Sequence, residues 1–169
     1  LQLRLEKVRS QRQQSRKARE KAEIPTIALV GYTNAGKSTL FNWLTESDTY
    51  TENLLFATLD PTLRKQTLPH FGPVVFVDTV GFIRNLPHQL VDAFRATLEE
   101  TEKADLLVHV VDLASQHREE DMAEVETVLS ELDVDEIPRL LAYNKIDLIQ
   151  ATPRIDFDEF GKPWRVWLS

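Results

Sequence analysis

The octapeptide GYTNAGKS at residues 31–38 has the residue types of a loop that holds phosphate groups. It matches the spacing G-x-x-x-x-G-K-[ST], and it lies between an apolar, β-branched segment and a helical pattern. Its two glycines let backbone N–H groups close around phosphates, the Lys37 ammonium can reach the β- and γ-phosphates, and the Ser38 hydroxyl can ligate Mg²⁺. We predict nucleotide contacts for Gly31, Tyr32, Thr33, Asn34, Ala35, Gly36, Lys37, Ser38 and Thr39.

A second motif, Asp78-Thr79-Val80-Gly81, stands about 40 residues further on, where the next strongly apolar segment ends. An aspartate at the carboxyl end of a strand lies near a nucleotide-bound Mg²⁺, usually through a water. The Gly81 N–H can bond the γ-phosphate, so that the loop beyond it responds to hydrolysis. We therefore predict that Asp78 contributes to a metal site and that Gly81 acts in catalysis together with Lys37.

A third motif, Asn144-Lys145-Ile146-Asp147, follows another apolar segment. The Asp147 carboxylate can accept two hydrogen bonds from the N1–H and the 2-amino group of guanine. Adenine lacks this pair of donors, and an unpaired carboxylate in a binding site is costly. Asn144 and Lys145 would brace the loop and cover the base, and Ser169 is expected to begin a loop that touches guanine from the far side.

The segment FATLDPT, residues 56–62, lies where a loop should close over the magnesium ion. A threonine hydroxyl is the expected ligand there in the triphosphate state. Thr58 and Thr62 both qualify, and spacing alone does not choose between them. We predict nucleotide contacts for Phe56, Ala57, Thr58, Leu59 and Asp60.

These motifs require elements that bring them to one edge of a sheet. Apolar or alternating segments predict strands over 26–31, 62–68, 73–79, 104–112, 138–144 and 164–169. Helical spacing predicts helices over 37–46 and 88–103 and through Met122, Val125, Val128, Leu129 and Leu132, and a polar loop is expected over 47–62. Strands that alternate with helices indicate an α/β fold with a mostly parallel sheet and helices on both faces. A helix normally covers such a last strand, so we expect the domain to continue with a further C-terminal helix.

The charge is uneven along the chain. Residues 1–23 hold eight Lys/Arg and three Glu, whereas the 169-residue chain has a net charge of −7. Residues 1–24 read as a basic linker helix before a domain over 25–169, and this helix is either solvated or an arm for a polyanion. The absence of cysteine excludes disulfides and thiolate metal sites. The sequence shows no membrane-spanning apolar run and no signal peptide, which favours a cytoplasmic protein.

Together the four motifs resemble those of the TRAFAC-class P-loop GTPases. The segments GYTNAGKSTLFN, LFATLDPTLR, DTVGFIRNLPHQLVDAF, HVVD and NKIDL are similar to those of the HflX family, ribosome-associated GTPases of the Obg–HflX group. The resemblance extends over nearly the whole chain from residue 25. It implies a P-loop GTPase fold, hydrolysis of GTP to GDP, Mg²⁺ as cofactor, and the large ribosomal subunit with its RNA as partner.

The same resemblance assigns Thr58 as the metal ligand beside Ser38. It also implies that residues 1–24 lead from a further N-terminal domain and that the protein takes part in splitting stalled ribosomes. We expect a monomer. Two rival functions stay open: a GTP/GDP-switched binding module with negligible hydrolysis, and an ATPase or small-molecule kinase with the same phosphate loop.

Phe82 occupies the position at which Ras-like GTPases carry the glutamine that orients the attacking water. Three interpretations follow: the protein binds GTP without hydrolysing it, a partner completes a slow site, or a group within the chain substitutes. The resemblance favours the second, with the ribosome as activator. For the third, Asn34 matches a position at which related GTPases use asparagine to help hold K⁺. The Phe82 and Ile83 side chains either fold back into the core or contact a partner.

Several other residues are expected to be structural. His109 lies in an apolar strand pattern and reads as an interior histidine. Trp164 and Trp167 are expected to pack under a helix that follows the last strand. The acidic run over 119–136 reads as a solvated helix face.

Overall fold

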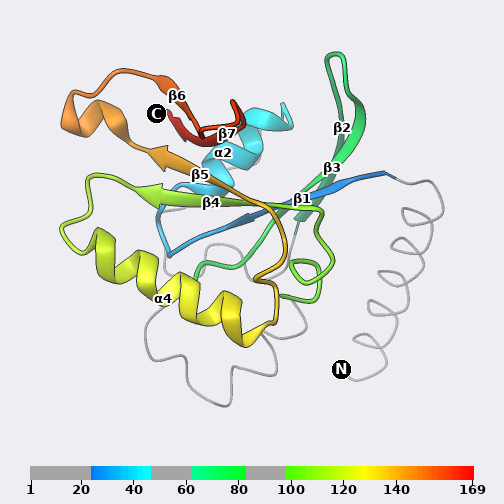
Figure 1. Cartoon of the computed structure of the whole chain (residues 1–169), viewed down its shortest axis with the longest axis horizontal. Helices are drawn as coiled ribbons and strands as arrows, with labels where there is room; N and C mark the ends of the chain where they lie inside the picture. The colour runs from blue at the N-terminus through cyan, green and yellow to red at the C-terminus, as the bar shows by residue number, and fades with distance from the viewer. Residues whose placement is uncertain (1–23, 47–61, 83–97) are drawn as a thin grey trace.

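Strand β1, Thr26–Val30, lies in the interior of a sheet (Figure 1). The structure is a computed structural model that describes residues 24–46, 62–82 and 98–169. Ala28, Leu29 and Val30 are fully buried. Apart from Thr26 the strand is apolar, because both faces of the sheet are covered.

The described residues form seven strands in the order β2-β3-β1-β4-β5-β7-β6. Strand β1 pairs in parallel with β3 and β4, and β5 pairs in parallel with β4 and β7, whereas β2 and β6 are antiparallel edges. Parallel strands bring their carboxyl ends to one edge, so the motifs that follow β1, β3 and β5 converge there. The bounds are β2 Thr62–Leu68, β3 Gly72–Asp78, β4 Leu106–Asp112, β5 Arg139–Asn144, β6 Arg154–Phe157 and β7 Pro163–Trp167.

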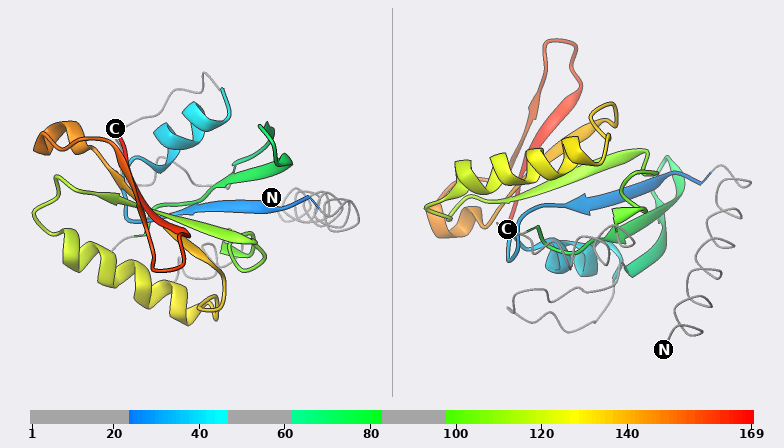
Figure 2. Two further views of the ribbon diagram at one scale, coloured as in Figure 1. Left: turned by 45° about the horizontal axis from the view of Figure 1, so that its top comes forward. Right: turned by 90° about the horizontal axis from the view of Figure 1, so that it is seen from below.

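Two helices lie on opposite faces of this sheet (Figures 1 and 2). Helix α2, Lys37–Leu44, buries Phe41 in one apolar cluster, with Leu29 and Phe76 from the sheet. Helix α4, Arg118–Glu131, buries Val125 and Leu129 in the other. A short 3₁₀ helix, η1, spans Ile146–Ile149. The α/β fold with a mostly parallel sheet is therefore confirmed.

The six predicted strands and the predicted helix over 37–46 are present, with ends that differ by a few residues, and the helix predicted through Met122 and Leu132 is α4, Arg118–Glu131. Strand β6 was missed because its four residues are polar or half-exposed and alternate too briefly to give a signal. The predicted linker helix over 1–24 falls almost entirely outside the described residues. The predicted polar loop, from residue 47 to 61, also falls outside the described residues. Of the helix predicted over 88–103, residues 88–97 fall outside them, and residues 99–103 form turns.

Strands β6 and β7 form a hairpin that projects from the sheet (Figure 2). The Arg154 guanidinium stacks on the Trp167 ring at 3.6 Å, and the Trp167 indole N–H donates to Asp156 at 2.8 Å. Arg165 lies over the ring of Trp164 at 4.3 Å. Both tryptophans, which were expected to pack under a following helix, thus have cationic partners within the hairpin itself.

His109 is interior, as predicted, with 1% of its surface exposed. Its Nδ1 lies 3.6 Å from a carboxylate oxygen of Glu126 on α4, and Arg139 on β5 forms a closer ion pair with the same carboxylate. His109 and then Arg139 lower the pKa of Glu126 to about 2, against the opposing effect of burial. Because 3.6 Å is too long for a hydrogen bond, we take Arg139 as the main partner. This carboxylate ties the helix to the sheet.

We predict that Glu126→Gln lowers the melting temperature at pH 7 by roughly 2–4 °C, as expected for a half-exposed ion pair of about 1 kcal/mol. The folded-state pKa of Glu126 is depressed, so its stabilisation is present above the ordinary glutamate pKa of about 4.3. It should be lost as the pH falls through about 2. Thermal unfolding at pH 7, 5 and 3 measures this, with Glu124→Gln on the same helix as control. If Glu126→Gln lowered the melting temperature by the same amount at pH 7 and pH 3, the ion-pair role of Glu126 would be contradicted.

Candidate functional site

The phosphate-loop motif forms the turn between β1 and α2. Gly31 has φ 149°, and a Cβ added there would lie 2.3 Å from the carbonyl oxygen of Val110 on β4. Gly36 has φ 96°, and its added Cβ would lie 2.2 Å from the side-chain nitrogen of Asn144 at the end of β5. Any other residue would push the loop away from the strand ends. The two glycines therefore fix the loop against the strands that carry the other motifs.

Lys37 begins α2 and is only 5% exposed. Its ammonium donates a hydrogen bond to the Tyr32 carbonyl at 2.8 Å, inside the loop. Burial lowers the pKa of Lys37 to about 8, and the nearby Asp78 carboxylate opposes that effect. The loop thus holds a poorly solvated cation, which a polyphosphate would stabilise in its charged form.

Ser38 and Asp78 meet at the predicted metal site. The Ser38 hydroxyl donates to a carboxylate oxygen of Asp78 at 2.6 Å, although the residues are 40 positions apart in the sequence. Asp78 ends β3 and is 3% exposed. A hydroxyl and a carboxylate side by side are hard oxygen donors of the kind that Mg²⁺ prefers. The residues present therefore fit the magnesium roles predicted for them.

The chain after Asp78 stays in contact with β1 and the phosphate loop. The buried Thr79 hydroxyl donates to the Leu29 carbonyl at 2.6 Å. The Phe82 N–H donates to the Gly31 carbonyl at 3.1 Å, and the Thr33 N–H donates to the Phe82 carbonyl at 3.0 Å. The Phe82 side chain is 2% exposed and belongs to the buried cluster on the α4 face. Of the two predicted positions for this ring, the core is the one observed.

The motif Asn144-Lys145-Ile146-Asp147 is bonded to the phosphate loop. The Asn144 side-chain amide donates to the Ala35 carbonyl at 2.9 Å, and the Lys145 ammonium donates to the Asn34 carbonyl at 2.8 Å. Asp147, in the first turn of η1, is exposed. The bracing predicted for Asn144 and Lys145 is thus present, and it leaves the Asp147 carboxylate open to a ligand.

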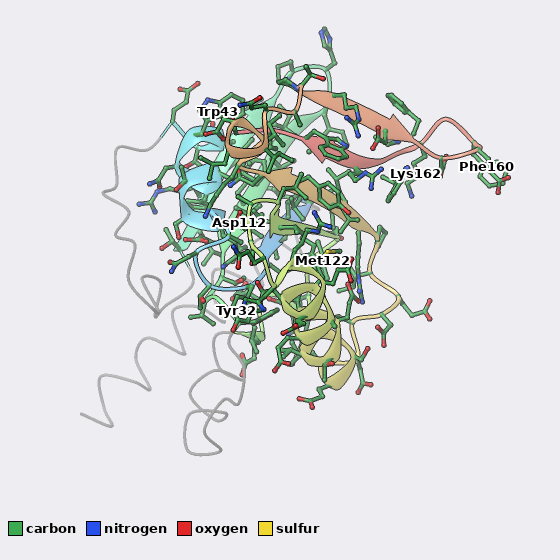
Figure 3. The ribbon with its side chains drawn as sticks, turned by 90° about the vertical axis from the view of Figure 1, so that its left-hand side faces the viewer. Tyr32, Trp43, Asp112, Met122, Phe160 and Lys162 are labelled. Atoms are coloured by element: carbon green, nitrogen blue, oxygen red, sulfur yellow. The ribbon has the colours of Figure 1, made fainter. Side chains whose placement is uncertain are left out.

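Asp112, the last residue of the HVVD segment, lies at this site although it was not among the predicted site residues. It ends β4 in register with Asn144, and its carboxylate accepts from Lys145 at 2.6 Å. Figure 3 looks onto these strand ends and labels Tyr32 and Asp112 there. The sequence could have indicated Asp112, because it is an aspartate at the carboxyl end of the strand that precedes α4. Ligand-binding residues of such sheets gather at the carboxyl ends of strands.

The sequence profile of a family described as 50S ribosome-binding GTPase matches residues 26–145. The chain belongs to this family. GTPase HflX of Escherichia coli (strain K12) is 58% identical over 170 residues, which cover 100% of this chain and 40% of that protein. GTPase HflX of Caldanaerobacter subterraneus subsp. tengcongensis is 55% identical, over 88% of this chain and 35% of that protein. These matches confirm the resemblance to the HflX family, and the chain spans less than half of these relatives.

Solved structures agree with the family. A GTP-binding protein from the archaeon Sulfolobus solfataricus, solved in complex with GDP, is 34% identical with a TM-score of 0.62, over 82% of this chain and 41% of that one. A single-residue variant of Era from Aquifex aeolicus, solved with GDP·AlF4⁻, has a TM-score of 0.63 at 23% identity, over 76% of this chain and 43% of that one. The second is a likeness of fold alone. The predicted P-loop GTPase fold is confirmed.

The predicted residues of this family's motifs lie together wherever the structure describes them. The Ile146 N–H donates to the Leu168 carbonyl at 3.3 Å, which places the end of β7 and the exposed Ser169 beside the motif that ends at Asp147. Phe56–Asp60, including the predicted metal ligand Thr58, fall outside the described residues. No helix in the described ranges is long and apolar enough to cross a membrane.

Proposed function

We propose that this domain binds GTP with Mg²⁺ and hydrolyses it to GDP and phosphate. The observation that carries the proposal is the pair of bonds from Asn144 and Lys145 to the carbonyls of Ala35 and Asn34. They join the phosphate loop to the motif that bears Asp147, so one bound molecule can offer its phosphates to the first and guanine to the second. The rival function is that of an ATPase or small-molecule kinase. If it were correct, ATP would displace labelled GTP, whereas selection of guanine by Asp147 should prevent this.

Hydrolysis by this chain would rest on positioning and charge, because phosphoryl transfer asks little covalent chemistry of the protein. Ser38 and Asp78 would hold Mg²⁺, with Thr58 as a further ligand, and the ion supplies charge neutralisation between the phosphates when bound. Lys37 offers positive charge to the γ-phosphate, and the Gly81 N–H offers a hydrogen bond. Water attacks the γ-phosphorus in line with the departing β–γ bridging oxygen.

Phe82 cannot supply the group that orients the attacking water, because its ring is buried. We infer that intrinsic turnover is slow and that the large ribosomal subunit, including its RNA, stimulates it. The family description as a 50S ribosome-binding GTPase supports that partner. The role would then be HflX-like, in the cytoplasm and as a monomer, on stalled ribosomes. A GTP/GDP-switched binding module with negligible hydrolysis is the alternative.

Steady-state phosphate release by this domain, with and without large ribosomal subunits, tests the proposal. We expect slow release alone and faster release with subunits. Phosphate release at background level in both cases, despite tight GTP binding, would establish the switched module instead.

Asn34 provides a second arm of the same experiment. It adopts φ 58°, and its carbonyl already accepts from Lys145, so its side chain is the part left for a ligand. We propose that this side chain helps to hold K⁺, whose charge would act between the phosphates. Turnover in KCl should then exceed turnover in NaCl at equal ionic strength, and equal rates would contradict it.

A further inference from the structure

Phe82 makes two backbone hydrogen bonds that form an isolated parallel bridge beyond the end of β1. Its N–H donates to the Gly31 carbonyl at 3.1 Å, and its carbonyl accepts from the Thr33 N–H at 3.0 Å. These two bonds, the Phe82 bridge, pair Phe82 with Tyr32 in parallel. The phosphate loop is thereby tied to the chain that follows Asp78.

We propose that Phe82 is a positioning residue, whose buried ring holds the Phe82 bridge and with it the Gly81 N–H beside the phosphate loop. This inference rests on the proposed function, because it concerns the response to the γ-phosphate. It assigns the apolar side chain a role of its own in the site, in addition to the loss of the water-orienting group.

Gly81 shows how closely the bridge holds the two segments. A Cβ added to Gly81 would lie 2.8 Å from both the Cα and the Cγ2 of Thr33, and 3.2 Å from the Lys37 ammonium nitrogen. Backbone at this distance leaves no space for any side chain. The Gly81 backbone thus lies in the immediate neighbourhood of the lysine that would meet the γ-phosphate.

The ring supplies the anchor for that contact. Phe82 is 2% exposed and shares the α4-face cluster with Val30 from β1 and Val80 from its own segment, which are at 0% and 1%. A side chain of the same polarity can keep this burial. A glutamine cannot, because its amide would be buried without a hydrogen-bond partner or would leave the core. Leaving the core would draw the Phe82 backbone away from Gly31 and Thr33.

If Phe82 merely stood in place of a useful glutamine, restoring a glutamine there would speed hydrolysis. A positioning role for Phe82 predicts a different result. Restoring a polar side chain with Phe82→Gln should not speed hydrolysis. It should loosen the bridge and weaken the state that needs the Gly81 N–H, which is the GTP state. GDP has no γ-phosphate, so its binding should change little.

The test compares wild type, Phe82→Leu and Phe82→Gln, with Phe71→Ala as control because Phe71 is 67% exposed in the β2–β3 turn. In Phe82→Gln we expect the GTP-to-GDP affinity ratio to fall about tenfold and single-turnover hydrolysis to be no faster than wild type. Phe82→Leu and Phe71→Ala should keep the ratio within about twofold. A merely structural residue would lower both affinities together.

Hydrogen exchange at the Thr33 amide of the nucleotide-free protein reports on the bridge directly. It should be protected in wild type and in Phe82→Leu and exchange roughly 10- to 100-fold faster in Phe82→Gln. Fast exchange in wild type, an unchanged Thr33 amide in Phe82→Gln, or faster hydrolysis by that variant would overturn the proposal. A wild-type protein that binds neither GTP nor GDP would instead refute the proposed function, and the exchange measurement would still decide the bridge.

Discussion

Replacing Lys37 by alanine is expected to lower the single-turnover rate of GTP hydrolysis by about 10²- to 10³-fold, the usual effect of removing one group that stabilises developing charge. Lys37 is 5% exposed, and its ammonium lies within the phosphate loop, where water screens it little. The nucleotide-free fold should not be weakened, since the substitution removes a cation that burial desolvates. Phosphate release from protein preloaded with GTP measures the rate.

The lowered pKa of Lys37, about 8, gives this prediction a pH dependence. The ordinary lysine pKa is about 10.4, so between these values the unfolded chain binds more protons than the folded one. The free energy of unfolding of the nucleotide-free protein should therefore rise with pH from about 8 to about 10. GTP favours the charged ammonium, so GTP affinity should fall as the pH rises from about 7 to about 9. In Lys37→Ala, both the rise in the free energy of unfolding and the fall in GTP affinity that come from this lysine should be absent.

Lys65→Ala on the exposed edge strand β2 is the matched control, because it removes the same charge away from the site. It should hydrolyse GTP at the wild-type rate and keep both pH trends. Equal rates for Lys37→Ala and Lys65→Ala would refute the role of Lys37 in catalysis.

Asp147→Asn is expected to weaken GTP binding by at least about 10²-fold, with the fold intact. The carboxylate is exposed in the first turn of η1, and the described residues offer its side chain no hydrogen bond or ion pair. The substitution replaces one of two acceptor oxygens by an NH₂ donor, which would face the donors of guanine. Xanthine carries a carbonyl at position 2, so the same variant should bind xanthosine triphosphate more tightly than wild type does. Competition between the two nucleotides measures the change.

Asp133→Asn provides the control for Asp147→Asn. Asp133 is exposed after α4 with φ 55°, a backbone conformation that asparagine tolerates. It should leave both affinities unchanged. If Asp147→Asn also leaves the GTP-to-xanthosine-triphosphate preference unchanged, Asp147 does not read the base.

The sequence predicts the site well where one short segment contains the whole signal. The phosphate loop is such a case, because its glycines, lysine and serine act within a single strand–turn–helix unit. The Ser38–Asp78 contact could also be expected, since parallel strands bring Asp78 to the edge where α2 begins. Strand β6 was not predicted, because its stability comes from pairing with β7 and from Arg154 stacking on Trp167.

The roles of Asp112 and Phe82 depend on long-range contacts. Asp112 reaches Lys145 because β4 and β5 pair in parallel with Asp112 opposite Asn144, a register that no local pattern contains. Phe82 was an open question in the sequence, where its ring could face the core or a partner. Packing against the α4-face cluster places it in the core.

The sequence by itself thus determined the fold class, the family resemblance and the residues that would meet phosphate and guanine, because each depends on residue types at fixed local spacing. The tertiary structure decided how these residues brace one another. It showed that Asn144 and Lys145 hold the phosphate loop and that the Phe82 backbone pairs with Gly31 and Thr33. Such contacts join residues that are far apart in the sequence, 109 positions for Asn144 and Ala35, and only the packing of sheet and helices fixes which of them meet.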